Sequence, residues 1–369
     1  MKKPASQTIM IGVCVLAICS APALAQIPTP SPSTTWTGGV GDWFNETNWS
    51  NDTVPNASLN ALINNGGTAQ ITSAEAGVAE TATLGLNLVD SGTVTVDGTT
   101  ASLSMSAGCV NTPEGFFPGL LSVGYAGTGT LNIKNGGTVS CLWGFMAAVA
   151  GDQFGTSNGT VSVDGEGSTL LLTGSCAGAV RLFVGGHFID GVGDDPGGVA
   201  LLSVTNGGLV DVHNLENQTS VKVGPSGTLT GNGTITTHGI DRLLHYLSYV
   251  TAIQGTFVPT GQFTITQDLA IAPSPSEGTL LCNVTQGNAP KVAVGGEANL
   301  HGRLSVIMTG TFTNDITQYT LLEAAGGWYM SNTRFDDVSI TYPTGQHFRP
   351  KIVYSDSVPT KVILQLTFF

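Results

Sequence analysis

The sequence predicts an all-β protein: a right-handed parallel β-solenoid with an aromatic N-terminal cap and a β-rich C-terminal block. Apolar and small polar residues alternate with a period of two through stretches such as 120–139, and glycines interrupt them every few residues. A related stretch returns at 182–210. The chain holds 50 glycines and only 10% charged residues, a composition that favours short strands and tight turns over helices. A repeated unit of this kind stacks in successive turns that bury one another.

Residues 1–25 are predicted to be a secretory signal peptide. Lys2 and Lys3 provide the positive start, residues 9–19 an apolar run, and residues 23–25 (Ala-Leu-Ala) a small-residue cleavage site. The apolar run is too short to span a bilayer comfortably. We therefore expect export, and no integral membrane segment once the signal peptide is removed.

Residues 26–35 are rich in Pro, Ser and Thr and are expected to form a linker. Directly after it come Trp36, Trp43 and Trp49, three of the five tryptophans in the chain. The first coil of a solenoid has an open end, which large aromatic side chains can cover. Capping is the expected role, and the alternative is a carbohydrate-binding platform.

Residues 36–237 contain the predicted solenoid repeats. Each copy has a Val-Asp-Gly opening, a Val-Gly element and an Asn-Gly-Gly turn. The two copies of these elements begin at Val96 and Val163, at Val123 and Val184, and at Asn135 and Asn206. Asn and Gly adopt positive φ at little cost, which tight turns between strands require.

The stretch LSVGYAGTGTLNIKNGGTVS (121–140) and the Val-Asp-Gly openings resemble the type V secretion/PEP-CTERM-associated repeat of bacterial secreted proteins, which is similar to autotransporter passengers. The head WTGGVGDWFNETNWS (36–50) and SGTLTGNGTITT (226–237) resemble other parts of such chains. The resemblance implies a parallel β-solenoid exported to the cell surface or beyond, and it implies no particular activity. The sequence departs from an autotransporter in lacking a long amphipathic barrel, so secretion through its own barrel is not expected.

Residues 238–256 break the strand pattern. Leu243, Leu244, Leu247 and Val250 follow helical spacing, which predicts a short helical or irregular insert at a boundary. Strand patterns return in residues 257–369, the expected C-terminal block. Four aromatic residues of this block are expected to form its core: Phe335, Tyr342, Phe348 and Tyr354.

Four cysteines remain after signal removal, and they permit three disulfide pairings. They are Cys109, Cys141, Cys176 and Cys282. Cys109 and Cys176 occupy equivalent repeat positions, so two or three stacked coils would separate them by about 10–14 Å, too far for a disulfide. Cys141 aligns with Val212, which indicates an apolar position. Buried thiols are therefore favoured.

The polar residues suggest few catalytic arrangements. The six histidines are His187, His213, His238, His245, His301 and His347. None has the spacing of a helical metal motif, and no Gly-x-Ser-x-Gly is present, so no metal, cofactor or catalytic residue is expected. The exception considered is the loop with Asp190, Asp194 and Asp195. It could hold calcium, act as a carboxylate pair, or be a solvated turn. A lyase would need an Arg or Lys base beside calcium-binding acids, and Arg181 alone gives this reading little support.

A net charge of −13 disfavours nucleic acid and anionic membranes as partners. The expected function is that of a secreted or surface-exposed scaffold or adhesin-like protein without catalysis. Its partners would be cell-surface glycans or other surface proteins. The alternatives are a carbohydrate-active β-helix enzyme, with acids gathered in a groove along the solenoid, and a passenger that binds no ligand.

Overall fold

The structure, a computed structural model, describes residues 32–72, 74–105, 119–146, 150–151, 155–173, 180–188, 194–213, 219–238, 250–271, 278–329 and 333–369. Residues 31–369 form one compact unit. Apart from two 3-10 turns, η1 (Glu46–Asn48) and η2 (Ser50–Asp52), the regular elements in the described residues are strands. None of the described residues belongs to a helix long and apolar enough to cross a membrane. The signal peptide predicted at 1–25 lies outside these residues.

Most strands belong to three sheets of eleven strands each. Sheet 1 contains, in hydrogen-bonding order, β1 (Ser33–Thr35), β3 (Asn60–Ile63), β6 (Ala82–Leu84), β9 (Leu120–Val123), β12 (Trp143–Met146), β17 (Val180–Val184), β22 (Thr219–Val223), β25 (Val250–Ile253), β28 (Asp268–Ile271), β31 (Glu297–Leu300) and β34 (Gly327–Trp328). Sheet 2 contains β2 (Val40–Asp42), β4 (Asn65–Ile71), β7 (Ser91–Asp97), β10 (Thr128–Lys134), β15 (Asn158–Asp164), β20 (Val199–Thr205), β23 (Gly227–Gly231), β26 (Thr256–Pro259), β29 (Thr279–Thr285), β32 (Arg303–Thr309) and β35 (Asp337–Thr341).

Sheet 3 contains β5 (Ala76–Ala79), β8 (Ser102–Met105), β11 (Thr138–Cys141), β16 (Thr169–Thr173), β21 (Leu209–His213), β24 (Thr234–His238), β27 (Gln262–Ile265), β30 (Lys291–Val294), β33 (Gln318–Ala324), β37 (Thr360–Phe368) and β36 (Phe348–Ser355). Two small hairpins lie outside the sheets: β13 (Ala150–Gly151) with β14 (Gly155–Thr156), and β18 (Gly186–Phe188) with β19 (Asp194–Pro196). The strands of the three sheets pair in parallel, except that β37 is antiparallel to both β33 and β36.

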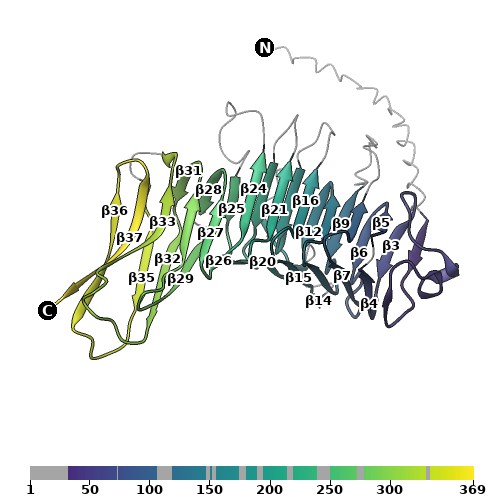
Figure 1. The fold of residues 1–369 in the computed structure, drawn as a ribbon, viewed down its shortest axis with the longest axis horizontal. Coiled ribbons are helices and arrows are strands. Elements are labelled where there is room, and N and C mark those ends of the chain that lie inside the picture. Colours follow the sequence, from purple (N-terminus) through teal and green to yellow (C-terminus); the bar gives the residue numbers. More distant parts are fainter. Residues whose placement is uncertain are drawn as a thin grey trace, which may run out of the picture. The chain divides into compact units, whose positions relative to one another are not determined.

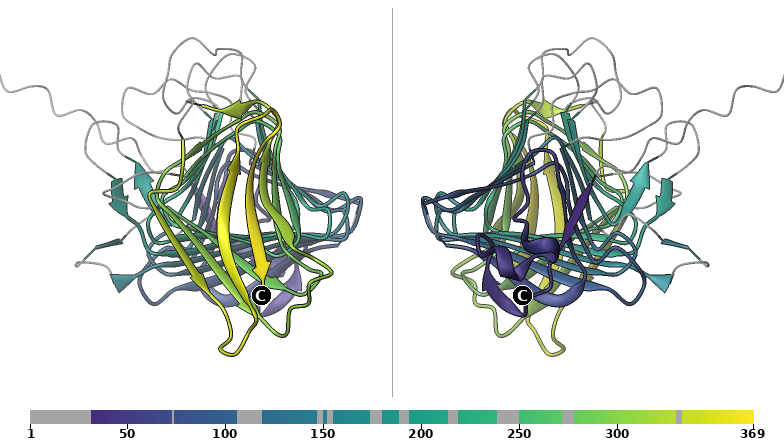
Figure 2. Two further views of the ribbon diagram at one scale, coloured as in Figure 1. Left: turned by 90° about the vertical axis from the view of Figure 1, so that its left-hand side faces the viewer. Right: turned by 90° about the vertical axis from the view of Figure 1, so that its right-hand side faces the viewer.

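From β3 to β33 the chain visits sheet 1, sheet 2 and sheet 3 in that order and then begins again. We call three such consecutive strands, one from each sheet, a coil. Successive coils lie along the sheets in sequence order (Figure 1), and their strands lie behind one another when the unit is viewed from its ends (Figure 2). This arrangement is compatible with a β-solenoid, so the nearly all-β parallel fold predicted from the alternation is confirmed.

The core lies between the three sheets. In β10 alternate residues are buried, so that Leu131 and Ile133 point inward while the residues between them are half-exposed. Buried side chains from all three sheets belong to one continuous cluster, which extends from Trp36 to Leu366. Each fully buried aliphatic side chain contributes about 1.5–3 kcal/mol relative to exposure. A single coil cannot bury its side chains alone, so it obtains this stabilisation only when neighbouring coils lie on both sides of it.

The repeat predicted from sequence spans two coils. Val123 in β9 and Val184 in β17 belong to the same sheet, and both lie in register with Met146 of the intervening strand β12. They are therefore two strand positions apart on a common sheet, as stacked turns require. The intervening coil is hard to recognise in the sequence because it lacks a Val-Gly element at this position.

The Asn-Gly-Gly turns join sheet 2 to sheet 3. Asn135 and Asn206 both have φ of 53°, and the glycine after each has φ of 86° or 87°. Their side chains reach back one coil: Asn135 donates to Asp97 and Asn206 donates to Asp164, each over 2.7 Å. The two motifs of the repeat, Val-Asp-Gly and Asn-Gly-Gly, are thus hydrogen-bonding partners in adjacent coils.

The expected domain boundaries do not interrupt the sheets. The expected linker 26–35 overlaps β1, in which Thr34 is buried and pairs with β3. Residues 239–249 of the expected insert lie outside the described residues. Val250 does not continue a helix but begins strand β25, which pairs with β22 and β28. At Val250 sheet pairing, rather than helical spacing, sets the structure.

The C-terminal end differs from the rest because an antiparallel hairpin, β36–β37, replaces the parallel strand of a further coil in sheet 3. Of the aromatic residues expected in this core, Phe335 and Phe348 are buried and Tyr354 is half-buried. Tyr342 is exposed, so its assignment to the core was wrong. It follows β35, the last strand of sheet 2, which has no further coil to cover it.

Candidate functional site

The N-terminal tryptophans form a buried cluster. Trp36, Trp43 and Trp49 are exposed by 0%, 0% and 2%. The ring of Trp49 meets the other two edge-on, with centroid separations of 5.1 and 4.9 Å, and its Nε1 donates to the carbonyl of Trp43 over 2.7 Å. A sugar platform needs an exposed ring face, which these residues do not offer. The buried cluster, which lies beside the first strands of the sheets, is compatible with the predicted aromatic cap.

The described cysteines, Cys141 and Cys282, are free and buried, as predicted. Cys141 pairs in sheet 3 with Leu172, which pairs in turn with Val212, so the thiol occupies an apolar column of the core. Burial raises the pKa of Cys282 to about 12 and also raises the pKa of Cys141. Both are held as unreactive thiols. Cys109 lies outside the described residues, as does Cys176.

The acidic loop is described only in part. Asp194 and Asp195 lie in β19, where the backbone of Asp195 pairs with His187 of β18. Asp190 lies outside the described residues, and Arg181 lies in β17. The calcium site and the catalytic pair considered for this loop stay predictions.

Three carboxyl groups in the described part of the chain have a pKa below the ordinary value, each because of neighbouring donors. A hydrogen bond from Asn135 and then Lys134 lowers the pKa of Asp97. Lys291, 2.6 Å away, and more weakly Lys361 lower the pKa of Glu323. These groups are held as carboxylates, whereas the general acid of a glycosidase needs a raised pKa.

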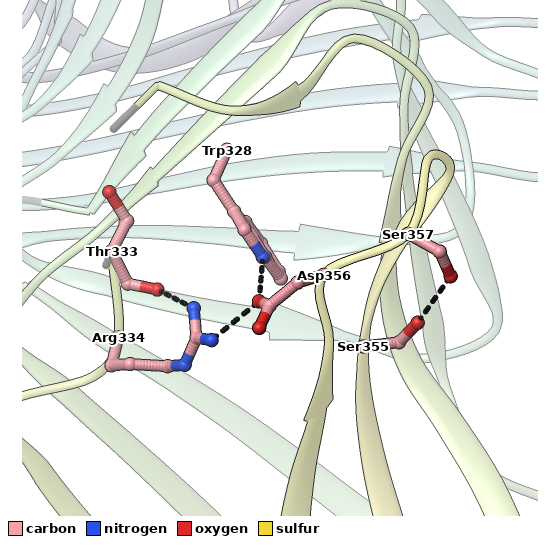
Figure 3. Close-up of polar contacts among 6 residues, drawn as sticks. All are labelled: Trp328, Thr333, Arg334, Ser355, Asp356 and Ser357. Atoms are coloured by element: carbon pink, nitrogen blue, oxygen red, sulfur yellow. Dashed lines mark hydrogen bonds and ion pairs between the residues drawn. The ribbon is translucent and has the colours of Figure 1, made fainter. Parts of the chain in front are cut away.

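The third is Asp356, whose pKa is lowered first by Arg334 and then by Trp328. These residues fasten the terminal hairpin to the edge of sheet 1 (Figure 3). Trp328 of β34 donates through Nε1 to Asp356 over 3.0 Å, and Arg334 also donates to this carboxylate. The guanidinium lies 5.7 Å from the centroid of the Trp328 ring and 4.6 Å from that of Tyr354. The arrangement joins a coil to the hairpin that ends the stack.

A second polar cluster lies on the outer face of sheet 3. Asp211 and His213 lie two residues apart on β21, and His238 of the adjacent strand β24 is in register with His213. The two imidazole centroids are 4.9 Å apart, and Asp211 Oδ1 lies 3.3 Å from His238 Nε2. One ligand atom from each residue lies within 4.8 Å of the others, a grouping that can hold a metal ion.

Sequence reasoning missed this cluster because it considered histidine spacing along a single helix. The signal is the alignment of successive coils, in which NGGLVDVH (206–213) lies over NGTITTH (232–238) and the final histidines coincide. Of the remaining histidines, His245 lies outside the described residues. His301 directly follows β31 of sheet 1, and its Nδ1 lies 3.4 Å from Asp336 Oδ1.

No protein-family model matches this chain, and no curated protein matches it either. What the protein does is therefore inferred from the placement of its strands, corners and side chains.

Proposed function

We propose that the protein is an exported, right-handed parallel β-solenoid that serves as a surface-exposed scaffold or adhesin. Its stack of coils would present variable loops to glycans or other proteins at a cell surface. The predicted signal peptide supports export, and the resemblance of residues 36–237 to secreted repeat passengers supports a surface location. A right-handed path is the general rule for parallel strands joined by crossover connections.

The observation that carries the proposal is that the connections between strands differ in length among the three corners. We call the connection from sheet 2 to sheet 3 the fixed corner. From β4 to β30 it is at most five residues long, and residues 286–290 form the longest example. Both corners that flank sheet 1 take long insertions. Residues 106–119 and 239–249 enter sheet 1, and residues 147–157 and 185–198 leave it. A scaffold that displays loops from one side needs this asymmetry, because function concentrates in loops held on a rigid frame.

The experiment compares binding by the exported chain and by loop variants. The first variant replaces 106–119 with the two residues, Glu80 and Thr81, that connect β5 to β6 at the same corner. The second treats 239–249 in the same way. The probes are a glycan array and intact bacterial and animal cells. Scaffold function predicts that the exported chain binds, and that at least one variant loses binding while its circular dichroism spectrum is unchanged.

The same preparations are tested for polysaccharide degradation. Release of sugar fragments by the exported chain would replace the scaffold with the carbohydrate-active enzyme as the correct function. Failure of the chain to reach the medium or the cell surface of a bacterial host would refute the proposed location.

A further inference from the structure

The cluster on sheet 3 is built on the most regular part of the fold. In β21 the residues alternate, so that Val210 and Val212 are buried in the core while Asp211 and His213 face outward, half-buried. His238 ends β24 in the same outward orientation. Parallel pairing fixes all three Cα positions, and only side-chain torsions are left to adjust. A site on paired strands is better organised for a ligand than one on loops.

One carboxylate oxygen in this cluster has no hydrogen-bond donor in the described part of the chain. Asp211 Oδ1 is buried and accepts no hydrogen bond among the residues that the structure describes, although His238 Nε2 lies within ion-pair distance. The three adjoining strands β16, β21 and β24 carry no Lys or Arg that could neutralise it. A buried carboxylate oxygen without a hydrogen bond is costly, and a bound cation removes that cost.

An ion pair between Asp211 and His238 would not explain why a second imidazole, that of His213, lies beside them. His213 lies against His238 with an interplanar angle of 47°. Two imidazole rings and one carboxylate form a ligand set that suits zinc and similar ions. Zn–N and Zn–O bonds of about 2.0–2.2 Å place ligand atoms roughly 3.3–3.5 Å apart. The Asp211–His238 distance already matches this value, and rotation of the His213 side chain can bring its nitrogen into the same range.

We propose that Asp211, His213 and His238 bind a divalent transition-metal ion of the zinc type, with the remaining coordination position open to water. The ion would join the C-terminal ends of β21 and β24, and so link two successive coils at the start of the corner that leads from sheet 3 to sheet 1. Hard cations such as Ca²⁺ and Mg²⁺ prefer all-oxygen sites and are not expected to compete.

The test uses the full chain, stripped with a chelator and dialysed, and titrated with ZnCl₂ by calorimetry. The variants are His213→Thr and His238→Thr, chosen because Thr173 occupies the same outward column one coil earlier. The matched control is His301→Gln, which removes a histidine that has one carboxylate neighbour, Asp336. We expect one Zn²⁺ per chain for the wild type and the control. Each threonine variant should bind at least about tenfold more weakly.

Two further measurements keep the outcome decisive. Melting of the metal-free variants by circular dichroism shows whether they fold like the metal-free wild type. If a variant fails to fold, the site is tested instead by the visible absorption spectrum of the wild type loaded with Co²⁺. Intense absorption bands indicate a low-coordinate imidazole site and support the proposal. A spectrum like that of hydrated Co²⁺ overturns it, as do absent zinc binding at millimolar concentration and threonine variants that bind like the wild type.

Discussion

The fixed corner allows a sharp prediction, because Asn206 performs two separable tasks there. Its backbone has φ of 53°, a left-handed conformation that an alanine adopts at a cost of about 1–2 kcal/mol. Its side chain donates to Asp164 over 2.7 Å in the coil before. The hydrogen bond is exposed, so we assign it about 0.5–1 kcal/mol. Asn206→Gly removes only the side-chain contact, whereas Asn206→Ala removes the contact and strains the backbone.

We therefore expect Asn206→Gly to lower the free energy of unfolding by about 0.5–1 kcal/mol and Asn206→Ala to lower it by about 1.5–3 kcal/mol. This order is the reverse of the usual one, since glycine in a strand is normally about 0.5–1 kcal/mol worse than alanine. Ser203 supplies the matched control. It lies half-buried in β20, close to the corner and without positive φ. At Ser203 the alanine variant should be the more stable of the two.

The assay is urea unfolding of the full chain followed by circular dichroism, with hydrogen exchange of residues 199–213 as a local readout. Local exchange is needed because long repeat stacks can unfold in parts rather than as one unit. If Asn206→Ala proves as stable as Asn206→Gly, positive φ is not what the corner requires.

Three further predictions concern the cap, the carboxylates and the thiols. Trp49→Ala should cost about 3–5 kcal/mol and should expose β1 and β2 to hydrogen exchange before β29 and β32; equal exchange along the stack would argue against a cap. Asn135→Ala should raise the pKa of Asp97 toward its ordinary value of 3.8, measured by carboxyl NMR titration. Because the folded pKa of Asp97 is lowered, its contribution is present above pH 3.8 and is lost as the pH falls through the folded value, so the pH-dependent part of the variant's loss of stability should be largest near neutral pH and should shrink in acid, and an unmoved pKa would contradict this. Cys282 should resist a thiol reagent in the native chain and react in urea, as mapped by mass spectrometry; rapid native labelling would show that the core is open there.

The parallel strands could be predicted because their cause is local. Period-two alternation places every second side chain inside whichever sheet a strand joins, and the positive φ of Asn135 and Asn206 follows from residue type. Val123 and Val184 could be placed on one sheet because the same short motif surrounds both. These inferences need no knowledge of where the intervening chain goes.

The cluster on sheet 3 could not be predicted in this way, because it depends on which strands are neighbours in the sheet. His213 and His238 meet only because β24 follows β21 in sheet 3, and the pairing is visible in the sequence only after the insertions have been assigned to corners. The short helical or irregular insert predicted at 238–256 extended too far for a related reason. Local spacing placed Val250 in the insert, but Val250 begins β25, which pairs with β22.

The corners connect the stability of the fold with its proposed function. At the fixed corner, groups of one coil bond to the next: the amide of Gly136 donates to Ser168 over 3.0 Å, and the amide of Asn206 donates to Asn232 over 2.8 Å. An insertion in one coil would remove bonds from its neighbours, which accounts for the short connections at this corner from β4 to β30. The longer connection, residues 310–317 between β32 and β33, lies beside the terminal hairpin. Because hydrogen bonds at the fixed corner hold successive coils in register, the two corners beside sheet 1 do not have to. Variation can then accumulate on one side of the molecule, where a surface protein meets its partners, without disturbing the buried columns that hold the coils together.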